Sequence, residues 1–275
     1  MSAVVHDGSA PRWRPTAFVQ ASIALHAVAV IAALLAPAQW PWALAAIGAN
    51  QVLLTGLGLW PRSRLLGPNF TRLPEACAAR GEVALTFDDG PDPELTPRVL
   101  DLLDAHGVRA TFFCIAEKAA RHPELTHEVV RRGHAVENHS NSHEHRFAFL
   151  LLRGLRRDLM AAQSTLTSLT GRRPRFFRPP MGFRNPLLDP VLHEMGLKLV
   201  SWTRRGYDTR RGDPARVAAD LERGLAAGDI LMLHDGYAAL APSGAPVVLE
   251  VLPRLIAELH RRGLKPVTLP QAIEP

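Results

Sequence analysis

From residue 82 onward, short apolar runs alternate with segments whose apolar residues recur every three or four positions. The runs are typical of buried strands, and the recurring pattern is typical of amphipathic helices. We predict strands at 82–87, 109–115, 134–138, 175–178, 197–202, 229–234 and 265–269. We predict helices at 94–107, 123–133, 152–169, 185–196, 213–228 and 246–263. Strands separated by helices indicate an α/β fold with parallel strands, either a (β/α) barrel of about seven strands, complete or not, or an open doubly wound sheet.

The beginning of the chain has a different pattern. No Asp, Glu, Lys or Arg occurs between Thr16 and Trp60. Two apolar stretches, 17–36 and 42–60, are each about as long as a helix that crosses a bilayer, and a short break with two prolines separates them. We therefore predict a transmembrane helical hairpin. The predicted organisation is a tail at 1–15, two transmembrane helices at 16–60, a linker at 61–81 and a folded domain at 82–275.

Two other interpretations of the apolar stretches were weighed. A buried hairpin of a soluble protein is disfavoured because neither helix has a charged outer face. A cleaved signal peptide has weak support from the APA sequence at 36–38, but the apolar stretch is too long and a second one follows at once. Trp40, Trp42 and Trp60 stand at the ends of the predicted spans, where indole rings favour the headgroup region.

The net charge of +6 and the pI near 10.1 suit a protein that lies against anionic membrane lipid. No basic stripe interleaved with aromatic residues and no zinc-finger spacing occurs, so we do not expect a nucleic-acid partner. The two cysteines, Cys77 and Cys114, do not suggest a disulfide framework.

Polar residues of unusual kinds follow the predicted strands. The motifs, in chain order, are Asp88-Asp89 in LTFDDGP, HSNSHEH at 139–145, RPP at 178–180, Trp202 with Asp208, and His234-Asp235. In a barrel the carboxyl ends of the strands converge on one face, where active sites lie. We therefore expect these residues to share one site.

His139 and His143 are four residues apart, which is a spacing typical of metal ligands. A hydrolytic centre needs a third ligand and a base, and the Asp pair can supply both if one carboxylate binds the cation and the other stays free. Arg178 is the candidate partner of the free carboxylate. Each motif also has a structural interpretation: a turn for LTFDDGP, chance spacing for the histidines, a surface salt bridge for Arg178 and a core histidine for His234.

In this order, LTFDDGP, HSNSH, RPPMG, the Trp202…Asp208 segment and ILMLHD resemble the five motifs of the polysaccharide deacetylase family of carbohydrate esterases (carbohydrate esterase family 4). The resemblance covers about residues 81–270 and implies a distorted (β/α) barrel that removes N-acetyl groups from amino sugars. The domain at 82–275 is accordingly predicted to be catalytic.

The resemblance also implies roles for single residues. It implies a metal ion, most commonly zinc, on Asp89, His139 and His143. It implies Asp88 as general base tethered by Arg178, and His234 as general acid oriented by Asp208. The implied substrate-binding residues are Pro180, Met181, Trp202, Met232 and Leu233. Met181 stands where an aromatic residue is usual and Met232 where Leu is frequent, although the backbone N–H at 181 can still serve an oxyanion.

We therefore predict a membrane-anchored, metal-dependent hydrolase that removes N-acetyl or other N-acyl groups from amino sugars of a polysaccharide or glycolipid. One alternative is a deacylase of a sugar linked to a lipid carrier at the cytoplasmic membrane face. The other is a non-catalytic membrane protein that binds sugars.

The arginines near the spans predict the side of the membrane. Arg12 and Arg14 precede the first span, and Arg62, Arg64 and Arg72 follow the second, whereas the connection carries no charge. The positive-inside rule therefore predicts a cytoplasmic catalytic domain, although family members that trim finished polymers work outside. Arginines near Asp208 are expected either to serve lipid-carrier phosphates or to be solvated surface charge: Arg204, Arg205, Arg210 and Arg211.

Overall fold

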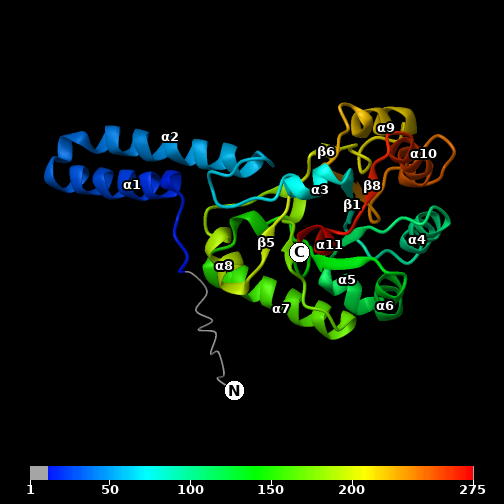
Figure 1. Ribbon diagram of the computed structural model, residues 1–275. Coiled ribbons are helices and arrows are strands. Elements are labelled where there is room, and N and C mark those ends of the chain that lie inside the picture. Colours follow the sequence, from blue (N-terminus) through cyan, green and yellow to red (C-terminus); the bar gives the residue numbers. More distant parts are fainter. Residues whose placement is uncertain (1–11, 275) are drawn as a thin grey trace, which may run out of the picture.

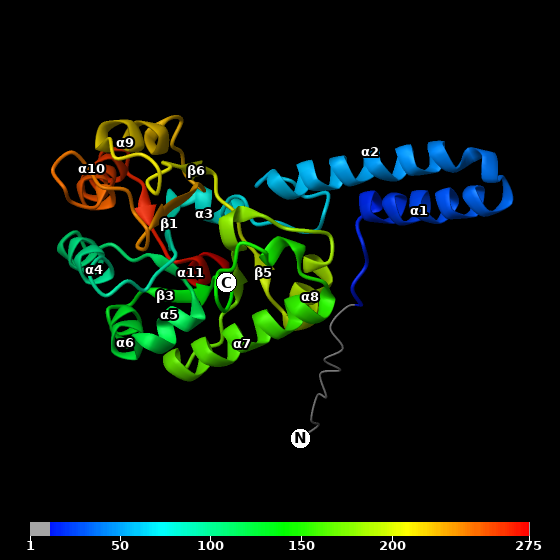
Figure 2. The same ribbon diagram turned by 180° about the vertical axis from the view of Figure 1, so that it is seen from behind.

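The structure is a computed structural model that describes residues 12–274. The predicted tail at 1–15 therefore lies largely outside the described residues. A helical hairpin projects from an α/β body, as Figures 1 and 2 show from opposite sides. The hairpin consists of α1 (Ala17–Leu35), the short helix η1 (Pro37–Gln39) and α2 (Trp40–Leu59).

The body is built on one curled, parallel sheet that forms a half-barrel. The strand order is β5-β4-β3-β2-β1-β7-β6, and β8 pairs with the beginning of β1. The two edge strands, β5 and β6, do not pair with each other within residues 12–274, so the barrel is incomplete. The predicted fold class, a distorted barrel with about seven strands, is confirmed. The strands are β1 (Glu82–Asp88), β2 (Thr111–Cys114), β3 (Ala135–Asn138), β4 (Phe176–Phe177), β5 (Lys198–Leu199), β6 (Arg204–Arg205), β7 (Ile230–His234) and β8 (Lys265–Pro266).

Helices cover the outside of this sheet (Figure 1). The six predicted amphipathic helices are α4 (Thr96–Ala105), α6 (Pro123–Arg131), α7 (Leu152–Thr170), α8 (Leu188–Met195), α9 (Pro214–Glu222) and α10 (Val247–Arg261). Five short helices were not predicted: α3 (Glu75–Ala79), α5 (Ala116–Arg121), η2 (Phe147–Phe149), η3 (Pro180–Gly182) and α11 (Leu269–Ile273). The predicted last strand, 265–269, is shorter than expected because Thr268 caps α11 in a capping box with Gln271.

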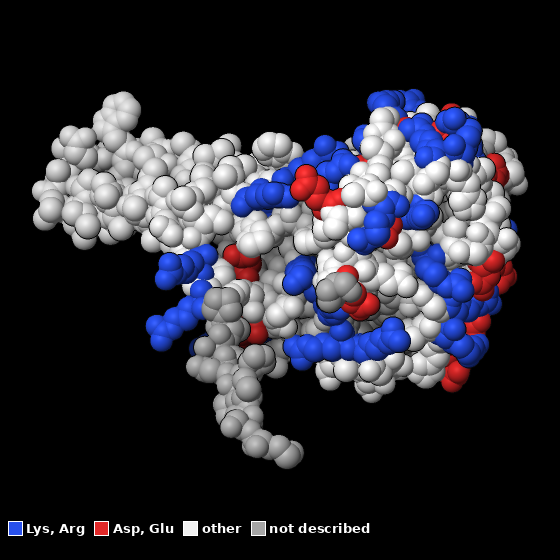
Figure 3. Space-filling model, in the orientation of Figure 1, with Lys and Arg blue, Asp and Glu red and all other residues white. Residues whose placement is uncertain are grey.

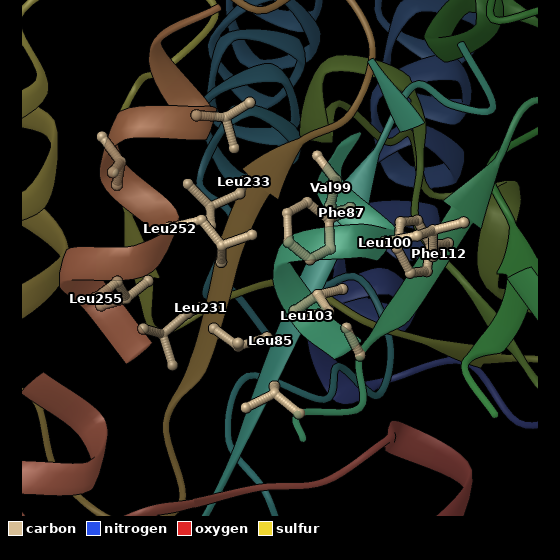
Figure 4. Packing of buried hydrophobic residues seen from close by; sticks show 14 of the residues in the cluster. Leu85, Phe87, Val99, Leu100, Leu103, Phe112, Leu231, Leu233, Leu252 and Leu255 are labelled. Carbon is tan, nitrogen blue, oxygen red and sulfur yellow. The ribbon is translucent and has the colours of Figure 1, made fainter. Parts of the chain in front are cut away.

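The core lies between β1, β7 and the helices α4 and α10. Leu85 and Phe87 of β1 and Leu231 and Leu233 of β7 are fully buried, and Figure 4 shows them packed with leucines of both helices. Strand β1 is buried along almost its whole length. A strand covered on both faces reads as a continuous apolar run rather than an alternating one, which explains the pattern EVALTF.

The hairpin is mostly exposed. Both helices are long and apolar enough to cross a membrane, and only 17% of each apolar window is buried inside the protein. Polar residues of the two helices face each other: the Asn50 side chain donates to Ser22 Oγ at 2.7 Å, and Gln51 Nε2 lies 3.1 Å from His26 Nε2. The polar positions of the second apolar stretch therefore find partners on the first.

The base of the hairpin contacts the body at the loop after β4, and the segment before α1 contacts α8. The Arg184 amide N–H donates to the Gly58 carbonyl at 3.3 Å. A Cβ atom on Gly58 would lie 2.3 Å from the Arg184 carbonyl oxygen, so only glycine permits this approach. Trp13, just before α1, donates from Nε1 to Asp189 at 2.7 Å.

The core packing predicts the effect of truncating Leu233. Leu233→Ala should lower the free energy of unfolding by about 2–5 kcal/mol, because it removes buried methyl groups and leaves a cavity. Denaturant unfolding in mild detergent measures this change. The control is Met160→Ala on α7, since Met160 is 60% exposed and should change stability by about 0.5 kcal/mol or less. Equal losses in the two variants would contradict the packing described.

Candidate active site

The predicted site residues converge at the carboxyl ends of the parallel strands. Asp88 is the last residue of β1 and pairs in register with His234, the last residue of β7. His139 follows β3, and Arg178 follows β4. A cavity of about 510 Å³ opens at this end of the sheet, and both Asp88 and His234 line it. The strand register thus places residues that are far apart in sequence around one space.

Asp89, His139 and His143 form a group with the composition of a metal site. Asp89 Oδ1 lies 3.2 Å from His139 Nε2 and 3.1 Å from His143 Nε2. One ligand atom from each of the three residues lies within 4.8 Å of the other two. Two imidazoles and one carboxylate are a zinc-type donor set that leaves a coordination position open.

Hydrogen bonds around this group indicate that it suits a cation. His139 Nδ1 lies 2.7 Å from the Arg178 carbonyl oxygen. A carbonyl only accepts, so Nδ1 carries the proton, and Nε2 is the nitrogen that faces Asp89. Asp89 Oδ1 is buried and has no hydrogen-bond donor within residues 12–274. Burial lowers the pKa of His143 to about 4, so that ring is neutral as a ligand must be.

Asp88 is held by a buried arginine. Arg178 is fully buried and donates from one terminal nitrogen to Asp88 Oδ1 at 2.6 Å and to Thr86 Oγ1 at 2.9 Å. Its other terminal nitrogen donates to the Ser201 carbonyl at 3.0 Å, and its guanidinium stacks 4.2 Å from the centre of the Phe113 ring. Asp88 is therefore fixed in place with one oxygen committed to the arginine. The two adjacent carboxylates therefore have different partners: Asp88 binds Arg178, and Asp89 belongs to the metal-type group.

His234 is held by Asp208. The ring nitrogen Nδ1 lies 2.8 Å from Asp208 Oδ1, and the His234 amide N–H donates to Oδ2 at 2.8 Å. Burial alone would lower the pKa of His234, but the buried Asp208 carboxylate outweighs it and raises the pKa to about 9. The imidazole therefore holds a proton at neutral pH. With Nδ1 bound to Asp208, Nε2 is the nitrogen left for the cavity.

Two glycines allow the loops after β1 and β7 to meet. A Cβ atom on Gly90 would lie 2.1 Å from the Asp235 carboxylate. A Cβ atom on Gly236 would lie 2.5 Å from the Asp89 carbonyl oxygen. Gly90 and Gly236 are thus required because the two loops approach each other closely, whatever turns they also form.

Left-handed backbone conformations cluster at this site. Within residues 12–274, the non-glycine residues with positive φ are Asp89 (73°), Ser140 (72°), His143 (55°), Met181 (56°), Tyr207 (60°) and Tyr237 (57°). All except Ser140 line the cavity. Such conformations cost about 1–3 kcal/mol each and persist where the surrounding structure imposes them, which is typical of functional sites.

The implied substrate-binding residues divide into two groups. Met181, Trp202 and Met232 line the cavity. Pro180 is buried and does not line it, and Leu233 packs in the hydrophobic core instead. Strand alternation explains the second difference, because neighbouring residues of β7 point to opposite faces of the sheet.

Several lining residues were not predicted: His145, Phe183, Arg205, Tyr207, Thr209, Arg210 and Tyr237. The sequence marked Arg205 and Arg210 only as members of an arginine-rich loop near Asp208. Tyr207 and Tyr237 carry no sequence signal, because their place at the cavity depends on left-handed turns that tyrosine does not favour.

Several known proteins are similar to this chain. The family model described as polysaccharide deacetylase matches residues 75–200. A peptidoglycan-N-acetylglucosamine deacetylase of Bacillus cereus is 31% identical over 199 residues, which cover 71% of this chain and 69% of that protein. A chitooligosaccharide deacetylase of a Bradyrhizobium species is 33% identical over 195 residues, covering 69% and 89%.

A solved structure has the same fold. The crystal structure of the Bc1960 peptidoglycan N-acetylglucosamine deacetylase, in complex with an N-oxidanyl-benzamide compound, superimposes with a TM-score of 0.67 at 28% identity. The match covers 74% of this chain and 92% of that one. These relatives show that the chain belongs to the polysaccharide deacetylase family, and their names as deacetylases of N-acetylglucosamine-containing polymers identify it as a hydrolase of amide bonds.

Proposed function

We propose that this protein is a membrane-anchored, metal-dependent N-deacetylase of amino-sugar glycans. One observation carries the proposal. A single cavity is bordered by a metal-type group, a carboxylate fixed by a buried arginine and a protonated imidazole fixed by a buried carboxylate. Amide hydrolysis needs an activated water, a stabilised oxyanion and a proton for the leaving amine, and these groups supply each requirement.

Asp89, His139 and His143 would hold a divalent cation, and their donor atoms suit zinc best. A cation bound there lowers the pKa of a water molecule and polarises the acetamide carbonyl. The carbonyl of Arg178 orients His139 through Nδ1, as the outer partners of metal-bound histidines usually do.

Asp88 is proposed as the general base. Its Oδ1 is committed to Arg178, so Oδ2 is the oxygen available to accept a proton from the attacking water. The Arg178 guanidinium keeps the carboxylate in one orientation and compensates its charge in a buried place. Asp88 and Asp89 thus have different tasks although they are neighbours in the chain.

His234 is proposed as the general acid. As the carbon–nitrogen bond breaks, Nε2 donates its proton to the amine nitrogen, and the Asp208 carboxylate stabilises the imidazolium before that transfer. The base on β1 and the acid on β7 lie on adjacent strands in register, so both border the cavity in which an acetamide would bind.

The loop after β4 is proposed to bind the carbonyl oxygen. The amides of Gly182 and Phe183 donate to the carbonyls of Pro179 and Pro180, but the Met181 N–H has no acceptor within residues 12–274. This free donor at the cavity is suited to an oxyanion. Trp202, Met181 and Met232 provide apolar walls for the acetyl methyl group.

The hairpin is proposed as the membrane anchor. Figure 3 shows Lys and Arg on the body and near the hairpin base, and none along the visible face of the hairpin. The loop that contacts Gly58 at this base, 181–184, also contributes Met181, Gly182 and Phe183 to the cavity. The cavity therefore lies close to the membrane end of the body. This proximity favours a second candidate substrate, an amino sugar linked to a lipid carrier.

The metal assignment predicts different effects for the two adjacent carboxylates. Asp88→Asn should keep the metal and lower turnover about 10²-fold or more, because only the base is lost. Asp89→Asn should lose the metal, because a ligand is removed. Metal content after dialysis and deacetylation of N-acetylated chitooligosaccharides measure the two effects. Asp101→Asn, at an exposed ion pair on α4, is the matched control that should change neither. Loss of metal in Asp88→Asn with retention in Asp89→Asn would reverse the two roles.

The His234–Asp208 pair predicts the alkaline limb of the pH profile. His234 acts only when protonated, so activity falls as the pH rises through its raised pKa. Asp208→Asn removes the carboxylate that raises this pKa, so the limb of kcat/KM should move to lower pH. An activated ester, whose leaving group needs no proton, should lose far less activity than an amide in His234→Ala. An unmoved limb together with equal losses on both substrates would mean that His234 has only a structural role.

The arginines that flank the hairpin predict that the body is cytoplasmic. A reporter that is active only outside the cytoplasm should therefore be inactive when fused after residue 275 and active when inserted at the connection near Ala38. Strong activity of the C-terminal fusion would contradict the cytoplasmic placement and remove the support for a lipid-carrier substrate. The polymer deacetylase proposal would then stand alone.

A further inference from the structure

Four arginines lie in β6 and in the segment that connects it to α9, and two of them are already paired. Arg204 donates from Nε to Asp229 at 2.9 Å, and Arg211 forms an ion pair with Asp220. Each of them therefore has a carboxylate partner, which it shares with a second arginine: Asp229 also pairs with Arg72, and Asp220 also pairs with Arg223. Arg204 and Arg211 do not line the cavity.

Arg205 and Arg210 differ from Arg204 and Arg211 both in their ion pairing and in their position at the cavity. Both line the cavity, and neither has a carboxylate within ion-pair distance in the described part of the chain. The Arg205 guanidinium lies over the rings of Trp202, at 5.2 Å, and Tyr207, at 5.0 Å. Its Nε is buried and finds no acceptor within residues 12–274. The side chain is thus held in place by stacking while a buried donor remains free.

The hydrolytic reaction does not account for these two cations. The carboxylates that line the cavity are Asp88 and Asp89, and the first is bound to Arg178 while the second belongs to the metal-type group. An acetamide group is neutral and needs no guanidinium.

We propose that Arg205 and Arg210 bind an anionic group, a carboxylate or a phosphate, carried by the reacting amino sugar or the unit attached to it. This inference rests on the proposed function and refines its substrate class from amino-sugar glycans in general to acidic ones. A guanidinium presents parallel N–H donors that match both anions. A stacked guanidinium loses little side-chain freedom on binding.

Three soluble substrates distinguish the possibilities. N-acetylated chitotetraose is neutral, a peptidoglycan disaccharide carries the muramyl carboxylate, and N-acetylglucosamine 1-phosphate carries a phosphate. The full-length, zinc-loaded protein in detergent should show a higher kcat/KM for at least one anionic substrate than for chitotetraose. The anionic substrate with the larger preference identifies the anion. Raising the ionic strength should raise KM for that substrate and leave the neutral one almost unchanged.

Variants then locate the preference. Arg205→Met, which keeps a long side chain on the rings, and Arg210→Gln should each lower the anionic-to-neutral ratio of kcat/KM by about 10- to 100-fold, mainly through KM, the usual effect of removing a hydrogen bond to a charged group. Arg216→Gln makes the same change of charge at an exposed arginine of α9 that does not line the cavity, and it should leave the ratio unaltered.

Binding measured by calorimetry on the same preparations keeps this inference separate from the proposed function. If no substrate is hydrolysed, the proposed function fails, but tighter binding of an anionic sugar that Arg205→Met abolishes would still support the anion site. If wild-type protein hydrolyses all substrates with equal kcat/KM, or if the ratio is the same in Arg205→Met, Arg210→Gln and Arg216→Gln, the inference is overturned and the deacetylase function remains.

Discussion

The organisation of this site depends on one buried cation, Arg178. Its guanidinium binds Asp88, Thr86 and the carbonyl of Ser201, and its own carbonyl fixes the ring of His139. The same residue therefore orients the proposed base by its side chain and a proposed metal ligand by its backbone. A buried ion pair contributes little net stability, but loss of one partner costs about 3–5 kcal/mol because the other charge stays buried and unpaired. Arg178 and Asp88 are thus each required by the other.

Charge compensation explains why acidic neighbours are tolerated in a buried place. Asp88 has Arg178, Asp208 has His234, and Asp89 faces two imidazoles with a buried oxygen that lacks a donor in the described structure. Partners within the chain compensate the charges of Asp88 and Asp208. The charge of Asp89 would be compensated by a bound cation. The left-handed residues around the cavity add strain that the packed sheet beneath it must hold. The packed sheet beneath the cavity therefore stabilises the strained backbone around it.

The position of the hairpin gives the site a physical context. The close contact of Gly58 with Arg184 ties the base of α2 to the loop after β4, which borders the cavity. An apolar hairpin in a bilayer would therefore keep the cavity near the membrane surface, within reach of a sugar on a lipid or of a polymer beside the membrane. The unpaired Arg205 and Arg210 face the same cavity and favour acidic glycans among these substrates.

The sequence by itself determined the alternation of strands and helices, the apolar hairpin and the residues at the ends of β1, β3, β4 and β7, because hydrophobic periodicity and short motifs are local properties. The tertiary structure decided what depends on register and close approach. Strand register paired Asp88 with His234, and pleat alternation sent Leu233 to the core while Met232 faced the cavity. Left-handed turns brought Tyr207 and Tyr237 to the rim. The sequence also did not show which of the arginines have a carboxylate partner. Asp229 and Asp220 come close to Arg204 and Arg211 only in the folded protein.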